Sequence, residues 1–147
     1  MYESQIEKYI DNALNMHHRM ERHRIDRDFM KTLCVDHCHM CGSHIHYKPL
    51  GKCVDKAEIK RKATLDRIKP GNLGGEYTND NIMIICLGCN SIKGDLYKPD
   101  DIMEFMKARK KKKTGNARKS FCRRMSKIAK FMENYIELKE IYNDTYL

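Results

Sequence analysis

Hydrophobic residues recur at helical spacing near both ends of the chain. Between residues 3 and 24 the apolar side of the predicted helix carries Ile6, Ile10, Ala13, Leu14 and His17, with charged residues on the other side. Asp26 is well placed to cap a second short helix, from Arg27 to Leu33. A last helix is expected from about 117 to 142, where the apolar spacing resumes and the first half is basic.

The middle of the chain has shorter apolar runs, which predict strands. Residues 63–67 and 82–85 are expected to be strands separated by a loop at 69–80, and a short helix is expected from Cys89. Residues 56–62 are expected to be a basic connector, and Asp100 and Asp101 are well placed to begin a helix through about Lys110. The pattern divides the chain into an N-terminal helical segment (1–33), a core (34–98) and a basic C-terminal helical segment (99–147).

The net positive charge of the chain points to a polyanionic partner. The 147 residues contain 29 Lys and Arg against 20 Asp and Glu, a formal charge of +9, and part of the excess is clustered. The run Lys110, Lys111, Lys112 and Lys113 fits a nucleic-acid arm, a nuclear-localisation patch or a solvated linker. With the basic helix beside it, we favour a surface that contacts nucleic acid.

Cysteine spacing indicates a metal site. Two Cys-x-x-Cys pairs, Cys38 with Cys41 and Cys86 with Cys89, are separated by 44 residues, and Gly42 allows a tight turn after the first pair. The N-terminus has no signal-peptide pattern and no run approaches a membrane span, so we expect an intracellular, reducing compartment. In such a compartment four thiolates favour one structural zinc ion over disulfides. His37 and His39 are alternative ligands of lower rank.

The stretch "TLDRIKPGNLGGEYTNDNIMIICLGCNSIKGD", with the upstream "CHMCG", resembles an HNH endonuclease of the ββα-metal type. The resemblance covers about residues 26–95. Within the family, this stretch is most similar to small HNH proteins of phages and large DNA viruses. It implies an α+β fold: a zinc-stabilised ββα-metal, treble-clef-like core with flanking N- and C-terminal helices. It also implies a viral or phage origin, in which case the protein acts in the host cell, in cytoplasm or nucleus, or in the virion.

The same resemblance assigns roles to four positions. Asp66 stands at the cation-binding position, Asn81 lies fourteen residues after Arg67, and Asn90 lies nine residues further, at the second cation-ligand position. Asp66 and Asn90 are therefore expected to bind Mg²⁺ or Mn²⁺ through oxygen atoms. Arg67 departs from the family, which places its general-base histidine there, because arginine stays protonated. Asn81, with no histidine to orient, is expected to hydrogen-bond to the backbone or to Arg67.

Arg67 leaves two functions open. It can clamp the scissile phosphate while another residue or a water on the cation transfers the proton, which makes the protein a metal-dependent DNA endonuclease. His44 and His46 are candidate bases, although a place on a hairpin surface explains them as well. Otherwise the protein is an inactive zinc-binding DNA adaptor or a subunit of a larger assembly.

The sequence also suggests which DNA and protein partners the chain can contact. Double-stranded DNA is the expected partner, and Lys93 and Lys98 are candidate contacts for its phosphate backbone, although a solvated face explains them equally well. The apolar side of the last helix can pack within the chain, bind a protein partner or form a homodimer. A purely structural role, in which the zinc core presents a helix to another protein, is the remaining alternative.

Overall fold

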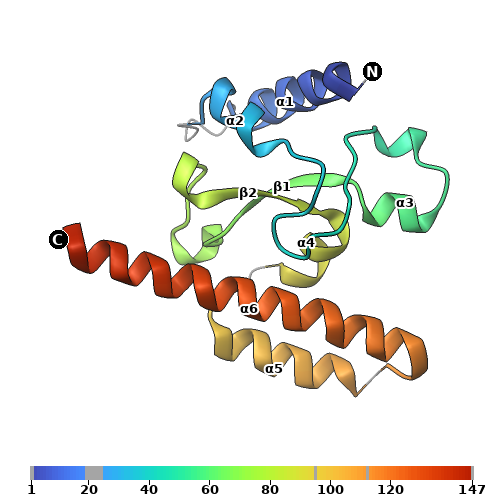
Figure 1. Ribbon diagram of the computed structural model, residues 1–147, viewed down its shortest axis with the longest axis vertical. Coiled ribbons are helices and arrows are strands. Elements are labelled where there is room, and N and C mark those ends of the chain that lie inside the picture. The colour runs from blue at the N-terminus through green and yellow to red at the C-terminus, as the bar shows by residue number, and fades with distance from the viewer. Residues whose placement is uncertain (1, 19–24, 95, 112, 147) are drawn as a thin grey trace. The chain divides into compact units, whose positions relative to one another are not determined.

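The computed structural model describes residues 2–18, 25–94, 96–111 and 113–146. Its contacts divide the chain into two compact units, residues 1–95 and 96–147, which we call the first and second units. The elements of the first unit are α1 (Tyr2–His18), α2 (Arg27–Leu33), α3 (Lys56–Lys60), β1 (Ala63–Arg67), β2 (Ile82–Cys86) and α4 (Leu87–Lys93), with short 3-10 turns at Leu50–Lys52, Gly71–Leu73 and Asn79–Asn81. The second unit contains α5 (Pro99–Lys110) and α6 (Gly115–Tyr146), and Figure 1 labels all the helices and strands.

The two N-terminal helices pack on each other. Ile10 of α1 and Met30 of α2 are fully buried. Asp26 caps α2 as expected, because its Oδ1 accepts a 2.7 Å hydrogen bond from the N–H of Phe29. Arg27 joins the two helices through ion pairs with Glu7 and Asp11. The part of the predicted first helix at 19–24 lies outside the described residues.

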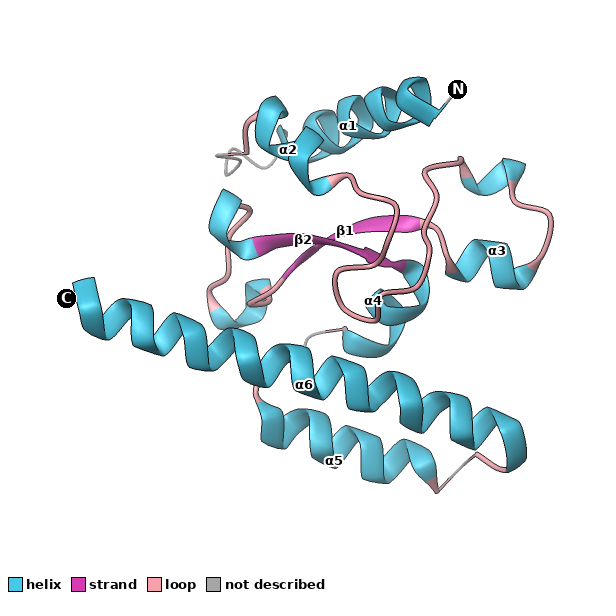
Figure 2. Cartoon of the chain, viewed as in Figure 1, coloured by secondary structure: helices cyan, strands magenta, loops and turns pink. Residues whose placement is uncertain are grey.

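The two strands form an antiparallel pair, and α4 packs against both of them (Figure 2). The register places Ala63 opposite Cys86 and Arg67 opposite Ile82. All five residues of β2 are buried, whereas most of β1 is half-buried. This strand–strand–helix unit, with its clustered cysteines, confirms the predicted α+β fold of ββα type.

One connector is helical instead of irregular. Residues 56–60 form α3, where the sequence predicts only a basic connector. Asp55 caps it, since its Oδ1 accepts from the N–H of Glu58 at 2.8 Å, and Glu58 reaches back to the N–H of Val54 at 2.8 Å. The helix has only five residues, too few for an apolar period to appear in the sequence.

The second unit consists of two helices that contact each other. Ile102 of α5 is buried, as are Phe121, Met125, Ile128 and Met132 of α6, which recur every three or four residues. Asp100 and Asp101 lie in the first turn of α5, as expected. Helix α6 begins at Gly115, two residues earlier than predicted, and the N–H of Arg118 already bonds to the carbonyl of Thr114 at 3.2 Å. None of the described helices has the length and apolar character needed to traverse a bilayer.

Candidate functional site

Four buried cysteines meet at one corner of the first unit. The Sγ atoms of Cys38, Cys41, Cys86 and Cys89 all lie within 4.8 Å of one another, and no disulfide joins the described cysteines. Backbone N–H groups are directed at the sulfurs: those of Cys41 and Cys86 lie 3.4 and 3.3 Å from Cys38 Sγ. Such donors favour the charged thiolate, which is the metal-binding form. The four cysteines can therefore hold a metal ion.

Local structure explains why the two pairs meet. Gly42 has a φ of +74° and its N–H bonds to the carbonyl of Cys38 at 2.9 Å, which closes the first turn. His39 attaches this turn to β2, because its N–H and its Nδ1 lie 3.1 and 2.7 Å from the carbonyl oxygen of Ile84. Cys86 ends β2 and also caps α4, accepting from the N–H of Cys89 at 3.3 Å. His37 and His39, the alternative metal ligands, are not part of the cluster found among the described residues.

A carboxylate and a lysine face each other between β1 and α4. Asp66 lies one residue before the end of β1, and its Oδ2 is 2.8 Å from Nζ of Lys93, the last residue of α4. The Lys93 side chain is 0% exposed and that of Asp66 is 16% exposed. Lys93 Nζ also donates to the carbonyl oxygen of Arg67 at 3.0 Å. Burial raises the pKa of the Asp66 carboxyl above its ordinary value, an effect that the Lys93 ammonium opposes.

Asn90 lies on the same side of β1 as Asp66. Its Nδ2 donates to Oγ1 of Thr64 at 3.1 Å, and the Thr64 hydroxyl donates to the carbonyl of Ile85 at 2.8 Å. Thr64 and Asp66 are two residues apart on a strand and so share a face, while Asn90 and Lys93 are three apart on a helix and also share a face. The structure therefore brings Asp66 and Asn90 to the same β1–α4 interface.

Arg67 is half-buried and held by an aromatic ring. Its guanidinium carbon lies 4.5 Å from the centroid of the Tyr77 ring. A Cβ atom added at Gly71 would lie 2.7 Å from Arg67 Nη1, so the lack of a side chain at Gly71 makes room for the guanidinium. Arg67 thus lies beside Asp66 in sequence and presents a fixed positive charge.

Asn81 fastens the loop between the strands. Its side chain is buried, accepts from the N–H of Lys69 at 2.8 Å, and donates to the carbonyls of Lys69 and Glu76 at 3.0 and 2.9 Å. The expectation that Asn81 bonds to the backbone in the absence of a histidine is confirmed. Gly75 is required in this loop, because an added Cβ would lie 1.8 Å from the Lys69 carbonyl oxygen.

The two candidate base histidines differ in their surroundings. His44 is exposed, whereas both ring nitrogens of His46 face the backbone: Nε2 is 2.7 Å from the carbonyl of Glu58, and Nδ1 accepts from the N–H of Lys48 at 3.3 Å. His46 is therefore committed to holding its own segment to α3. No described contact links either histidine to Asp66.

The predicted phosphate contacts fall into different environments. Lys93 does not fit that role, because its side chain is buried and directed at Asp66 and Arg67. Lys98 and Lys111 are exposed, and Lys113 is half-buried with its Nζ 5.3 Å from the centroid of the Phe121 ring. Lys112 lies outside the described residues, as does the side chain of Lys110.

Sequence reasoning missed the pairing of Lys93 with Asp66. One signal was present, because Lys93 follows Asn90 by three residues on the predicted short helix. Residues at that spacing share a helix face, so a side chain three residues after a predicted cation ligand faces β1 as well. Thr64 and Tyr77, which contact Asn90 and Arg67, had no comparable signal.

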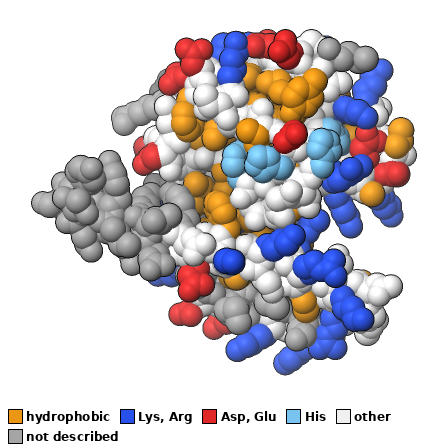
Figure 3. All heavy atoms as spheres, viewed as in Figure 1, with side chains coloured by type: hydrophobic (Ala, Val, Ile, Leu, Met, Phe, Trp, Pro, Cys, Tyr) orange, Lys and Arg blue, Asp and Glu red, His pale blue; other side chains and the backbone are white. Residues whose placement is uncertain are grey.

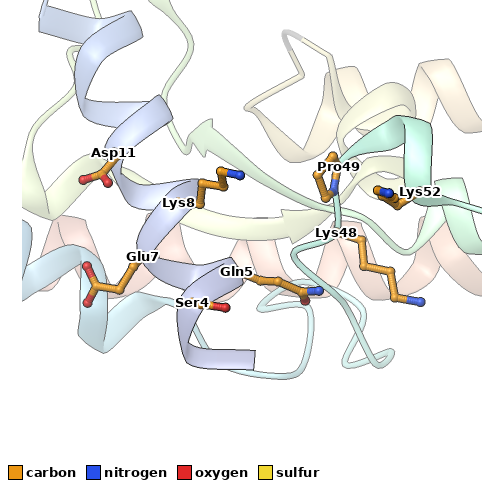
Figure 4. Close-up of a pocket in the computed structure, with 8 residues that line it drawn as sticks. All are labelled: Ser4, Gln5, Glu7, Lys8, Asp11, Lys48, Pro49 and Lys52. Carbon is orange, nitrogen blue, oxygen red and sulfur yellow. The ribbon is translucent and has the colours of Figure 1, made fainter. Parts of the chain in front are cut away.

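A groove of about 840 Å³ lies elsewhere in the first unit, between α1 and the Lys48–Lys52 segment. Figure 4 shows Gln5 and Lys8 reaching from α1 toward that segment, whereas Glu7 and Asp11 point away from it. Glu7 and Asp11 pair with Arg27, and Lys48 pairs with Glu58 at 2.6 Å. Most charges around this groove are therefore already used within the fold.

Comparison with known proteins gives one match. Residues 38–96 match the family model described as HNH endonuclease, so this part of the chain is a domain of that kind. No curated protein and no solved structure matches the chain. The matched segment begins at the first metal-cluster cysteine and includes β1, β2 and α4, together with Asp66, Arg67, Asn81 and Asn90.

Proposed function

We propose, from the premise that residues 38–96 are an HNH endonuclease domain, that the protein hydrolyses phosphodiester bonds of DNA with the help of a divalent cation. One observation carries the proposal: Asp66 and Asn90 both lie at the β1–α4 interface, in the chain order that the family resemblance requires. The four-cysteine cluster supports it, because Asn90 directly follows the cluster residue Cys89 and is thereby fixed relative to β1.

Zinc is the proposed occupant of the cysteine cluster. Four cysteine thiolates in a closed arrangement are the usual ligands of structural zinc in proteins. All four residues are buried, so the arrangement leaves no position for a substrate. The cluster therefore serves the fold, and it implies a reducing compartment in which thiols persist.

The Asp66–Asn90 pair fits Mg²⁺ or Mn²⁺. Asp66 supplies carboxylate oxygens, the ligands that hard cations prefer, and its Oδ2 already has a cationic neighbour in the Lys93 ammonium at 2.8 Å. Asn90 uses its amide nitrogen on Thr64, and its amide oxygen is the atom of that group that hard cations prefer. When bound, such a cation would stabilise negative charge on the phosphate and on the leaving oxygen.

Arg67 is proposed to hold the phosphate group. A guanidinium is always charged, binds phosphate through two parallel hydrogen bonds, and cannot accept a proton. The Tyr77 ring and the space at Gly71 hold the guanidinium in place at the end of β1. Arg67 thus contributes charge and orientation, and the proton of the attacking water passes to another acceptor.

The second unit is proposed to attract the DNA backbone. Lys119, Arg123, Lys127 and Lys130 are exposed and lie on the side of α6 opposite to its buried Phe121, Met125 and Ile128. Figure 3 shows many Lys and Arg side chains on the surface of this unit. Contacts of this kind are made to phosphates and do not depend on base sequence.

A plasmid cleavage assay tests the proposal. Zinc-loaded protein should convert supercoiled plasmid to nicked or linear DNA with Mg²⁺ or Mn²⁺ and not with EDTA. Asp66→Asn should lower the rate by about 100-fold or more, as expected for loss of a charged group at the reaction centre. Asp28→Asn is the matched control, because Asp28 is an exposed carboxylate on α2, and it should leave the rate unchanged.

Arg67→His sharpens the result. If Arg67 clamps phosphate, histidine should lower the cleavage rate or leave it similar, because it cannot make the bidentate contact. A large gain with histidine would mean that Arg67 had silenced the site. DNA binding without cleavage by the wild-type protein, with either cation, would contradict the nuclease proposal and establish the adaptor function instead.

A further inference from the structure

Lys93 is a fully buried lysine whose position is not explained by packing alone. Lysine is almost never fully buried unless it is paired, because its ammonium loses hydration. Only Glu58, Asn81 and Lys93 are buried polar or charged residues among those that the structure describes. Glu58 and Asn81 cap or fasten the backbone near them, whereas Lys93 crosses from the end of α4 to β1.

The contact between Lys93 and Asp66 is chiefly one of charge. Nζ lies 2.8 Å from Oδ2, and it also donates a hydrogen bond to the carbonyl of Arg67 at 3.0 Å. The ammonium therefore lies at the carboxylate oxygen that a divalent cation would otherwise use. This arrangement is expected if the Lys93 ammonium takes the position of a metal ion next to the Asp66 carboxylate.

We propose that Lys93 is an internal cation that neutralises Asp66 in the absence of a divalent ion and competes with that ion for the carboxylate. The inference rests on the proposed function, because it takes Asp66 as a cation ligand. Lys93 is a positioning residue in this account: it acts on the bound ion through Asp66.

Electrostatics gives the proposal its direction. Two positive charges at one carboxylate repel each other, and the repulsion is stronger in a buried site than in water. Without Lys93, the half-buried Asp66 carboxylate would lack its counter-charge, which is destabilising. Lys93 therefore stabilises the cation-free fold and at the same time weakens cation binding.

A purely structural clamp makes the opposite prediction for the cation. If Lys93 only holds β1 against α4, its removal should disorder Asp66 and weaken cation binding along with stability. If Lys93 is an internal cation, its removal should lower stability without the ion and tighten binding of the ion. Affinity for the cation thus separates the two roles, whereas stability alone does not.

The test compares Mn²⁺ binding by the zinc-loaded full chain and by two neutral variants, Lys93→Met and Lys93→Gln. Thermal melting and calorimetric titration with Mn²⁺ are the measurements. Both variants should melt earlier than wild type without Mn²⁺, should be stabilised more by Mn²⁺, and should bind it about tenfold more tightly. Lys93→Gln is included because it can still donate to the Arg67 carbonyl and is the variant better able to fold.

Two controls locate the effect. Lys60→Gln removes an exposed lysine of α3 and should change neither melting nor Mn²⁺ affinity. The double variant Asp66→Asn with Lys93→Gln removes both charges, so it should recover much of the stability that Lys93→Gln alone removes, and it should show no tightened Mn²⁺ binding. Tightened binding in the double variant would place the effect away from Asp66 and overturn the proposal.

The readout is independent of cleavage. Unchanged or weaker Mn²⁺ binding by Lys93→Gln, or no Mn²⁺ binding by any of the proteins, overturns the inference even if the wild type cuts DNA. Tighter Mn²⁺ binding by Lys93→Gln in a protein that does not cut DNA upholds the inference and contradicts the nuclease proposal alone.

Discussion

The two units of the chain use charge in different ways. The first unit contains 15 Lys and Arg against 13 Asp and Glu, a net charge of +2, whereas the second contains 14 against 7, a net charge of +7. In the first unit several charges are paired within the fold, as in Arg27 with Glu7, Lys48 with Glu58 and Lys93 with Asp66. The excess positive charge of the second unit can attract an external polyanion.

The units also differ in what stabilises them. The first unit has a two-stranded sheet, which is too small to be stable without further support, and its four clustered cysteines can hold a metal ion. The second unit is a pair of helices with an apolar contact that includes Ile102, Met125 and Ile128. The proposed chemistry thus lies in the unit whose backbone a metal can fix, and the proposed attraction of DNA lies in the unit with excess positive charge.

Removing one metal ligand should have the largest effect, and it should affect the two units differently. Cys86→Ser should abolish metal binding and unfold the first unit, because the binding energy of a structural zinc ion, about 10–16 kcal/mol, matches or exceeds the whole stability of a typical domain. The helices of the second unit should persist. Metal stoichiometry by mass spectrometry and backbone amide NMR would measure both effects.

Cys53→Ser is the matched control for that experiment. Cys53 is half-buried in the same unit and lies outside the cluster. It should retain one equivalent of metal and a folded first unit. A Cys86→Ser protein that stays folded in both units would show that the cluster is not what stabilises the first unit.

A smaller effect is expected from the loop that Asn81 fastens. Asn81→Ala removes three hydrogen bonds of a buried side chain to the backbone of Lys69 and Glu76, which should cost about 1–3 kcal/mol. Hydrogen exchange should accelerate at residues 69–76 and remain unchanged in α5 and α6. Asn79→Ala is the control, because Asn79 makes only a 3.3 Å contact with Asp26; equal losses of stability in the two variants would refute this role for Asn81.

The smallest change should appear in the salt dependence of DNA binding. Changing Lys110, Lys111, Lys112 and Lys113 to Gln should lower the slope of log affinity against log salt by about one for each phosphate that is no longer neutralised, and leave melting of the first unit unaltered. Fluorescence anisotropy with duplex DNA measures the slope. Neutralising Lys8, Lys52, Lys56 and Lys60 of the first unit should change it less, and a larger change there would reverse the assignment of attraction to the second unit.

The sequence predicted those features whose determinants are close together or regularly spaced. Cys38 with Cys41 and Cys86 with Cys89 could be paired because metal ligands have short, recognisable spacings. The helix cap at Asp26 and the buried spacing of α6 follow from local chemistry and helical period. Asn81 could be assigned to the backbone because the histidine that it would orient is missing.

The rest depends on contacts between distant residues. The partner of Lys93 lies 27 positions earlier in the chain, and the usual preference of lysine for the surface suggested a phosphate contact instead. His46 looked available until α3, itself too short to show a period, placed the carbonyl of Glu58 beside it. The spacing of Lys93 from Asn90 indicates a shared helix face but not the partner, and the His46 contact has no local signature, so both partners required the folded arrangement.

The space at Gly71 has a consequence for how related sequences should differ. To keep its place against the Tyr77 ring, an arginine at position 67 needs the room that glycine leaves at 71, because an added Cβ would meet its guanidinium at 2.7 Å and the flexible side chain would have to move. A shorter histidine at 67 would lift this constraint, so the two positions should change together over evolution, with glycine at 71 inherited alongside arginine at 67. Gly75 meets only backbone and should persist whichever residue occupies position 67.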